Sequence, residues 1–292
     1  MKNIKYYIGA ILITTFGCNH NEDKADAYGN FEAIDVLVSA EAAGRILNFL
    51  PLEGESLQKG HVTVHIDSTQ QHLKKKQLQS GLATLRSKIN TLDAQVRASR
   101  VQLKNLEREK ERIDNLVEGG AATSKQRDDI EGQIAFLEAQ IAAAESQKTS
   151  VYSERNTLDV QIQQVEDLIW KSEIRNPIDG VLLNKYKEQG EMAIPGQPLF
   201  KMANMDELIL RAYVSGEQLS EVKVGGSVRV HFDKAGEMGE VSGVVSWVSP
   251  RAEFTPKIIQ TRQERVNLVY AIKVVVPNDG SLKIGMPGEV NF

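Results

Sequence analysis

The residues best suited to recognition chemistry lie around two adjacent glycines, in the stretch RIDNLVEGGAATSKQ that starts at Arg112. Arg112 carries a planar, permanently charged guanidinium that suits carboxylates or backbone carbonyls. Leu116 adds an apolar side chain four residues later, and Thr123 and Ser124 each add a hydroxyl beyond the glycines. Such a set fits a small contact with another protein. The alternative is that Arg112 is solvated and Leu116 only closes a helical seam.

The remaining candidates for chemistry are isolated. His61, His65 and His72 have no cysteine or clustered carboxylate beside them, so surface imidazoles are favoured over a metal site. Lys201 in FKMAN has the look of a carrier lysine, but a lysine at the edge of a β core is the preferred interpretation. Neither a GxxxxGK[ST] phosphate loop nor a GxSxG nucleophile motif occurs. We therefore expect no enzyme activity, no cofactor and no metal.

The N-terminus has the pattern of a targeting segment. Lys2 and Lys5 precede an apolar run that is short for a membrane span and fits a secretory signal. Cys18, the only cysteine, follows Gly17 at the end of this run, as in a bacterial lipoprotein signal, although Thr15 replaces the usual leucine. We expect Cys18 to be the lipid anchor, with an ordinary cleaved signal or an uncleaved N-terminal segment as alternatives. The net charge of −4 gives no basic excess to favour nucleic acid.

A proline-free tract between Pro51 and Pro177 must position the glycine pair, and it carries a sustained heptad pattern. Apolar residues recur in alternating steps of four and three on both sides of the glycines. When the two arms are laid antiparallel, facing layers such as Leu85 with Leu158 have residue numbers of constant sum, and the midpoint falls beside the glycines. Lys110, Lys148 and Arg155 then face apolar residues. The pattern predicts an antiparallel coiled-coil hairpin, against the alternative of a parallel dimer of continuous helices.

The segments that flank this tract resemble each other. Gly54 and Gly60 in the first correspond to Gly190 and Gly196 in the second, each pair bounding a turn between short strands. Each half alone has too few strands to bury a face, so the hairpin must return the chain for a single β module to close. From Asp206 onward, short alternating strands between glycines predict a small antiparallel barrel.

This nested order resembles the HlyD-like membrane fusion proteins, most clearly in SAEAAGRI, NPIDGVL, the glycine-pair stretch and AEFTPKIIQTRQERVNLVYAIKV. The resemblance implies an elongated α+β chain with a lipoyl-like β module split by the hairpin. Its expected parts are a signal and anchor (1–18), a tether (19–35), the first half module (36–67), the hairpin (68–173, tip near 118–124), the second half module (174–205) and the barrel (206–292).

By the same resemblance, the chain is a periplasmic adaptor held at the inner membrane. Its implied partners are an inner-membrane transporter of the ABC permease and ATPase type, a TolC-like outer-membrane channel, and further copies of itself in a hexamer. The family's tip motif has an arginine, a leucine four residues on and a serine seven further. Arg112 and Leu116 match it, whereas the last place holds Thr123 and Ser124 comes one later. A coiled-coil envelope spacer lipoprotein and a biotinyl or lipoyl carrier subunit are the alternative functions.

Overall fold

The computed structural model describes residues 25–234, 236–254 and 268–292. They fall into two compact units, one of residues 35–204 and one that joins the chain up to Ile34 with Met205–Phe292. The predicted signal and anchor, including Cys18, lies outside the described residues. So does the greater part of AEFTPKIIQTRQERVN, the stretch on which the resemblance to the ABC-linked branch depends.

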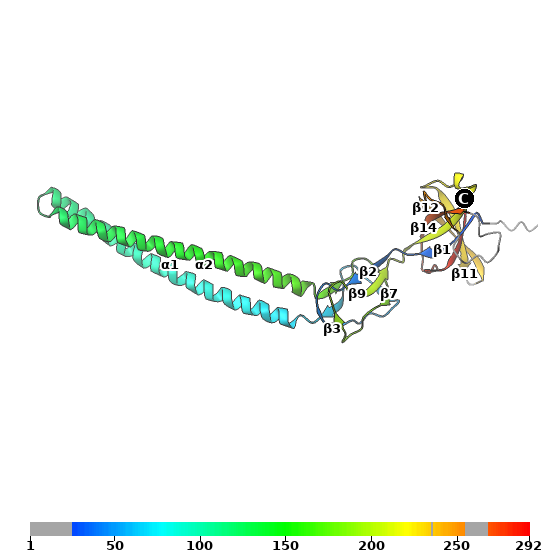
Figure 1. The fold of residues 1–292 in the computed structure, drawn as a ribbon, viewed down its shortest axis with the longest axis horizontal. Coiled ribbons are helices and arrows are strands. Elements are labelled where there is room, and N and C mark those ends of the chain that lie inside the picture. Colours follow the sequence, from blue (N-terminus) through cyan, green and yellow to red (C-terminus); the bar gives the residue numbers. More distant parts are fainter. Residues whose placement is uncertain (1–24, 235, 255–267) are drawn as a thin grey trace, which may run out of the picture. The chain divides into compact units, whose positions relative to one another are not determined.

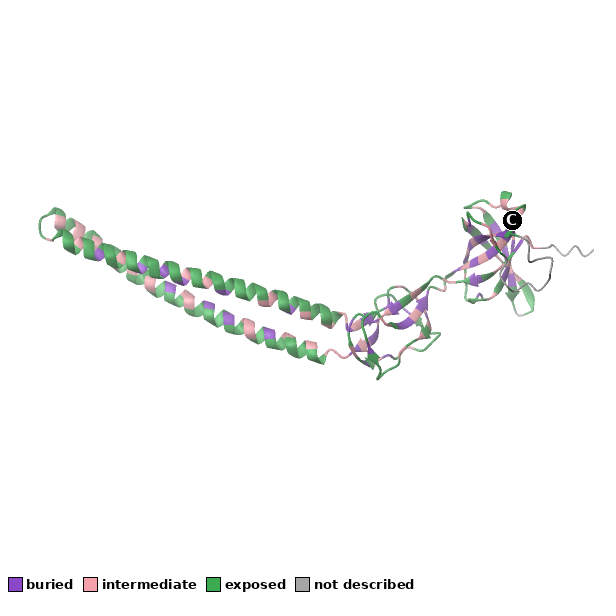
Figure 2. Cartoon of the chain, in the orientation of Figure 1, coloured by how far each residue is buried: buried purple, intermediate pink, exposed green. Residues whose placement is uncertain are grey.

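Two long helices lie side by side in the first unit (Figure 1). Helix α1 (Thr69–Glu118) has 50 residues and helix α2 (Ser124–Trp170) has 47, so each is roughly 70–75 Å long at 1.5 Å per residue. The buried residues are Leu78, Leu85, Ile89 and Val96 on α1 and Ile130, Leu137, Ile141, Ala144, Val151 and Ile162 on α2. They recur along the facing sides of the two helices (Figure 2).

The packing of the seam confirms the predicted antiparallel hairpin. Leu85 packs in one cluster with Leu158 and Val151, and Leu103 packs in another with Ile141. These are pairs that the constant-sum rule placed in the same or adjacent layers. The apolar repeat alone therefore determined both the direction and the register of the two helices.

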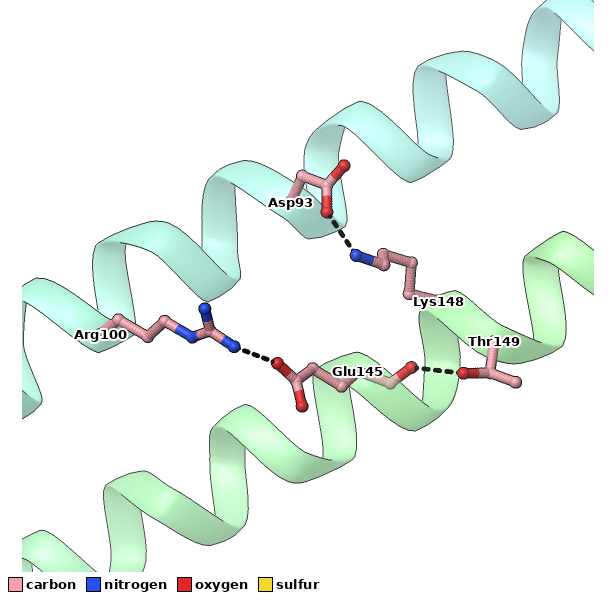
Figure 3. A network of polar contacts seen from close by, with 5 residues as sticks. All are labelled: Asp93, Arg100, Glu145, Lys148 and Thr149. Atoms are coloured by element: carbon pink, nitrogen blue, oxygen red, sulfur yellow. Dashed lines mark hydrogen bonds and ion pairs between the residues drawn. The ribbon is translucent and has the colours of Figure 1, made fainter.

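Ion pairs between the helices flank the apolar seam. Lys148 Nζ lies 2.8 Å from Asp93 Oδ1, and Arg100 lies 2.6 Å from Glu145 (Figure 3). Two further bridges join Lys110 to Glu131 at 3.0 Å and Lys75 to Glu166 at 2.9 Å. The lysines at seam positions thus reach carboxylates of the opposite helix as well as facing apolar residues.

Two four-stranded sheets form the β part of this unit. Strands β2 (Asp35–Ser39), β3 (Gly44–Asn48), β4 (Ser56–Leu57) and β5 (Val62–Ile66) precede the hairpin, and β6 (Glu173–Arg175), β7 (Gly180–Lys185), β8 (Met192–Ala193) and β9 (Pro198–Ala203) follow it. The sheet orders are β2-β9-β7-β4 and β6-β5-β3-β8. Each sheet combines strands from both sides of the hairpin, so neither half builds a sheet alone.

The strand pairings reproduce the internal repeat of the sequence. Exchanging β2, β3, β4 and β5 with β6, β7, β8 and β9 converts one sheet order into the other. The glycines matched by sequence share a backbone conformation, since Gly54 and Gly190 have φ of 89° and 93° and Gly60 and Gly196 have φ of 78° and 86°. Positive φ favours glycine, which explains why glycine recurs at these turns.

The second unit is a closed antiparallel barrel. Its strands are β1 (Ala27–Glu32), β10 (Glu207–Ser215), β11 (Ser227–Lys234), β12 (Glu237–Val248), β14 (Leu268–Pro277) and β15 (Pro287–Asn291), with β13 (Glu253–Phe254) added to β14 and the 3₁₀ turn η1 (Gln218–Ser220) after β10. The pairing runs β10-β1-β15-β11-β12-β14, and β14 pairs back with β10 to close the ring. The predicted small barrel is confirmed.

The predicted tether over 19–35 is wrong where the structure describes it. Ala27–Glu32 forms strand β1, inserted between β10 and β15, and Ala27 and Phe31 are fully buried. A Cβ on Gly29 would lie 1.9 Å from the Arg211 carbonyl oxygen, so glycine is needed where β1 meets β10. The sequence suggested a loop here because the segment contains glycine and asparagine. In the structure, the same segment fills the place between β10 and β15 and pairs with both.

Candidate functional site

The tip of the hairpin is the place where the recognition candidates meet, and its backbone is closed by caps on both sides. Gly120 has φ of 72°, its N–H donates to the Val117 carbonyl at 3.0 Å, and Ala121 N–H donates to the Leu116 carbonyl at 2.7 Å. These two bonds form a Schellman motif that satisfies the last carbonyls of α1. The glycine pair therefore ends α1, as its cost within a helix predicts.

Thr123 begins the second helix. Its hydroxyl oxygen accepts from Gln126 N–H at 3.4 Å, and Gln126 Oε1 accepts from Thr123 N–H at 2.9 Å. This reciprocal arrangement is a capping box. Ser124, the first residue of α2, is exposed, and its hydroxyl has no hydrogen-bond partner among the described residues. The two hydroxyls that the sequence could not separate thus differ in their hydrogen bonds.

Arg112 and Leu116 lie one helical turn apart on the last two turns of α1. Leu116 is 43% exposed, which is high for a leucine beside a coiled-coil seam. Arg112 is exposed and forms an ion pair with Glu109, one turn earlier on the same helix. That hydrogen bond raises the pKa of Arg112, so the guanidinium stays charged at any physiological pH. Its exposed side leaves it available to a further carboxylate or carbonyl.

A second group of charges ties the two arms together just behind the tip. Lys110 bridges to Glu131 across the seam and lies 4.0 Å from Asp114 on its own helix. The hydrogen bond that Lys110 donates to Glu131 is the main cause of the raised pKa of Lys110. The Lys110–Glu131 ion pair joins α1 to α2 close to the tip, so it holds the end of α1 that carries Arg112 and Leu116 beside α2.

The structure thus separates the predicted tip residues by their present contacts. Arg112, Leu116 and Ser124 are exposed, whereas the hydroxyl of Thr123 is used in the cap. Two contributing residues were not singled out from sequence. Glu109 pairs with Arg112, and Gln126 completes the cap; the Thr-x-x-Gln spacing is a capping-box signal that would have identified the latter.

The three histidines singled out from the sequence divide between a hollow in the β part and helix α1. His61 and His65 line one open hollow of about 650 Å³ with Glu55 and Arg175, whereas His72 lies in α1. Within the described ranges, no three His, Cys, Asp or Glu side chains are grouped so that they could hold a metal ion.

Lys201 lies on β9 and forms an ion pair with Asp35 at the start of β2. The hydrogen bond that Lys201 donates to Asp35 raises the pKa of Lys201 above the ordinary lysine value. Lys201 therefore lies at the edge of the β core and is paired with Asp35. This is the placement that the sequence favoured over a carrier lysine.

In the part of the chain that the structure describes, no helix is long and apolar enough to cross a membrane.

Solved structures of adaptor proteins share this fold. The membrane fusion protein Spr0693 of Streptococcus pneumoniae R6 superposes with a TM-score of 0.57 at 15% identity, covering 90% of this chain and 96% of that one. MacA of Actinobacillus actinomycetemcomitans gives 0.54 at 18% identity, over 91% and 78% of the chains. The periplasmic adaptor protein EmrA gives 0.51 at 18% identity, over 92% and 97%. The chain therefore has the fold of these membrane fusion and periplasmic adaptor proteins.

Among curated proteins, the chain is similar to the UPF0194 membrane proteins. It is 23% identical to one from Yersinia enterocolitica over 99% of both chains. A shorter match, 35% identical over 117 residues, joins it to one from Acidithiobacillus ferridurans and spans 34% of that relative's length. No family profile matches the chain.

Proposed function

We propose that this chain is a non-catalytic periplasmic adaptor. It links an inner-membrane transporter, of the ABC type, to a TolC-like outer-membrane channel through which drugs or other small molecules are exported. The ABC pairing is supported by the sequence resemblance of residues 252–274, and the adaptor role by the fold.

The observation that carries the proposal is that the residues that close the turn differ from the exposed side chains at the tip. The backbone groups of the turn are satisfied by the Schellman motif and the capping box, without any contribution from the side chains of Arg112, Leu116 or Ser124. These three exposed side chains are therefore not needed to close the hairpin. A charged fork, an apolar side chain and a hydroxyl at a helix end form a compact protein contact, and repetition around a ring would strengthen it through multivalency.

The caps also favour one hydroxyl for docking. Recruiting Thr123 would take its oxygen from the Gln126 amide and weaken the start of α2, whereas Ser124 has no such commitment among the described residues. We assign the docking hydroxyl to Ser124 and the capping role to Thr123.

We interpret the paired four-stranded sheets as a lipoyl-like module divided by the hairpin. The two sheets are built from a repeated four-strand unit, as expected for such a module. A true carrier would present its modified lysine at the turn between the halves, and α1 and α2 occupy that place. The module then serves as the base from which the hairpin projects.

Anchorage at the inner membrane is assigned to acylated Cys18. Because β1 begins at Ala27, the residues between Cys18 and β1 could span at most about 30 Å. The adaptor copies are proposed to assemble as a hexamer, so that six tips meet the channel together.

The test is export by a strain that carries Arg112→Asp with Leu116→Ser. We expect helix content, membrane association and self-assembly to stay normal while export is lost. Arg86→Asp is the matched control, since Arg86 is an exposed arginine on the same helix, distant in sequence from the tip. Normal export by the double variant at normal protein level would refute the assignment of the tip as the docking surface.

A further inference from the structure

The strand register gives the barrel two ends that differ in their connections. At one end β1 and β14 start and β10, β12 and β15 finish, because the neighbouring strands are antiparallel. We call this the entry end, since the chain enters β1 there; residues 216–226 and 249–252 connect strands at it. At the opposite end, the linker end, β1 finishes and β10 starts, and the chain continues into residues 35–204.

Large apolar side chains are exposed at the entry end. Phe254 and Leu268 face each other across β13 and β14 and are 79% and 54% exposed. Val224, 66% exposed, lies in the connection between β10 and β11. The next residue, Gly225, donates its N–H to the Val245 carbonyl at 2.8 Å, so Val224 is held beside β12. Three exposed apolar side chains from two separate connections therefore occur at the same end.

Two aromatic residues are exposed on the strands that reach this end. Tyr28 is the second residue of β1, and Trp247 is the last but one of β12. The Lys273 ammonium lies 5.4 Å from the centre of the Trp247 ring. Tyrosine and tryptophan, with an apolar ring and a polar tip, are the residues that proteins place at the boundary between lipid and water.

The charges of the entry end are close to balance. Two carboxyl groups there are bonded within the barrel, because Asp26 accepts from the Phe292 amide at 3.0 Å and Glu253 pairs with Arg211 at 3.1 Å. The other charged residues of these connections, among those described, are exposed and of both signs: Glu217, Glu221, Lys223 and Arg251. The entry end therefore has no excess of cations with which to attract an anionic surface.

The linker end is acidic instead. Among the described residues, six exposed carboxylates stand there against two exposed lysines: Glu32, Asp206, Glu207, Asp233, Glu237 and Asp279 against Lys234 and Lys283. Carboxylates are repelled by an anionic lipid surface and are costly to desolvate. Of the two ends, only the entry end combines exposed aromatic side chains with balanced charge.

The N-terminal segment reaches the barrel at this same end. Asp26 N–H donates to the Val290 carbonyl at 2.9 Å, so the chain is fixed to β15 just before β1 starts. The residues between Cys18 and β1 span at most about 30 Å. An anchor at Cys18 therefore keeps the entry end within that distance of the membrane.

We infer that the entry end rests on the lipid surface of the inner membrane. Phe254, Leu268 and Val224 enter the boundary between headgroups and acyl chains, and Tyr28 and Trp247 lie among the headgroups. Because the exposed charges balance, the contact depends on the burial of apolar surface. So few side chains bind weakly by themselves, but the anchor holds the lipid beside them and makes the contact effective. The inference rests on the proposed anchorage at the inner membrane.

Fluorescence quenching tests the contact in the full anchored chain. The chain has two tryptophans, Trp247 and Trp170 at the end of α2. In phosphatidylcholine vesicles with acyl chains brominated near the headgroup, Trp170→Phe leaves Trp247 as the sole fluorophore, and we expect its fluorescence to be quenched. Trp247→Phe is the matched control, and its remaining Trp170 should not be quenched. Unquenched Trp247, or equal quenching of both tryptophans, would overturn the inference.

Substitutions at the two ends of the barrel identify the residues that bind. Phe254→Ser with Leu268→Ser should lower the partitioning of the Cys18→Ser chain onto phosphatidylcholine vesicles by about tenfold or more. Both side chains are exposed, so thermal unfolding should be unchanged. Met238→Ser with Ile284→Ser is the matched control, because both are exposed apolar residues of the linker end, and it should not change partitioning. Equal losses in the two double variants would contradict the assignment.

Val224→Asp adds an independent check, since Val224 lies in a different connection and should lower partitioning in the same direction. Binding that requires phosphatidylglycerol and disappears in high salt would overturn the apolar contact.

The anchor and the contact can fail separately. Intact mass reports whether Cys18 is acylated, whereas quenching of Trp247 in the anchored chain reports only the entry end. An acylated chain without quenching would leave the anchorage intact, refute the lipid contact and assign this end to a protein partner.

Discussion

Thr123 and Gln126 satisfy each other's backbone amides at the start of α2, while the hydroxyl of Ser124 beside them has no partner among the described residues. The hydroxyl of Thr123 thus caps α2, whereas the hydroxyl of Ser124 is exposed. The arrangement allows fold and recognition to be separated by neighbouring substitutions.

Thr123→Ala should destabilise the hairpin, because the amide of Gln126 loses its acceptor. The expected loss is about 1 kcal/mol, the usual cost of removing a threonine N-cap. Ser124→Ala should leave stability unchanged and weaken channel binding instead. Thermal unfolding followed by helical circular dichroism, alongside an export assay, checks both; equal melting of the two variants would contradict the assignment.

Gly120→Ala should destabilise the tip by about 1 kcal/mol, because Gly120 has φ of 72° and alanine is strained there. Gly119→Ala is the matched control. Gly119 has φ of −80°, and an added Cβ would lie 3.5 Å from its nearest neighbour, so this change should be neutral or slightly stabilising. Denaturant unfolding gives the free energy of unfolding of both variants. A larger loss for Gly119→Ala than for Gly120→Ala would contradict the prediction.

The Asp93–Lys148 pair predicts a pH dependence of hairpin stability. The hydrogen bond that Lys148 donates to Asp93 raises the pKa of Lys148 in the folded chain. A raised pKa adds stability that is complete below the ordinary lysine pKa and is lost as pH rises through the folded value. Stability should therefore fall at strongly alkaline pH, and Asp93→Asn should reduce this part of the fall. An unchanged alkaline profile in Asp93→Asn would show that the pair contributes nothing.

Phe31→Ala should strongly destabilise the barrel although the sequence around it resembles a linker. Phe31 is fully buried in the barrel core, so its truncation should cost about 3–5 kcal/mol. Ile34→Ala is the control, because Ile34 is 71% exposed and should change stability by no more than about 0.5 kcal/mol. Proteolysis of the barrel and its unfolding transition report the difference.

Cys18→Ser should release the protein from the membrane fraction, because Cys18 is the only thiol that can be acylated. Fractionation followed by intact-mass measurement checks the lipid directly. Tight membrane association of the variant would indicate an uncleaved N-terminal segment as the anchor.

The long-range order of the chain was predictable because it rests on repeated patterns. The heptads identified partners such as Leu85 and Leu158 across the hairpin, and the glycine pairs identified the two halves of the β module. In each case many residues recur at a fixed spacing and support the same prediction, so one atypical residue does not change it.

The misses are single elements with no repetition to support them. Strand β1 buries only Ala27 and Phe31, too few for alternation to be recognised, and its place in the barrel depends on β10 and β15, which begin only at Glu207 and Pro287. Likewise, only the hydroxyl of Thr123 accepts from the Gln126 amide, and the hydroxyl of Ser124 does not. This difference depends on local geometry, which the residue type alone does not determine.

The insertion of both helices into one β module constrains how such a chain changes length over evolution. Strand β5 precedes α1, strand β6 follows α2, and β5 and β6 pair with each other. Both helices therefore start from the same point of the β module. A heptad added to one arm alone would move the bend away from Gly119 and Gly120 and mismatch the layers of the seam. Length can therefore change only by matched insertions or deletions, so that relatives with longer or shorter reach should differ by paired heptads placed symmetrically about the tip.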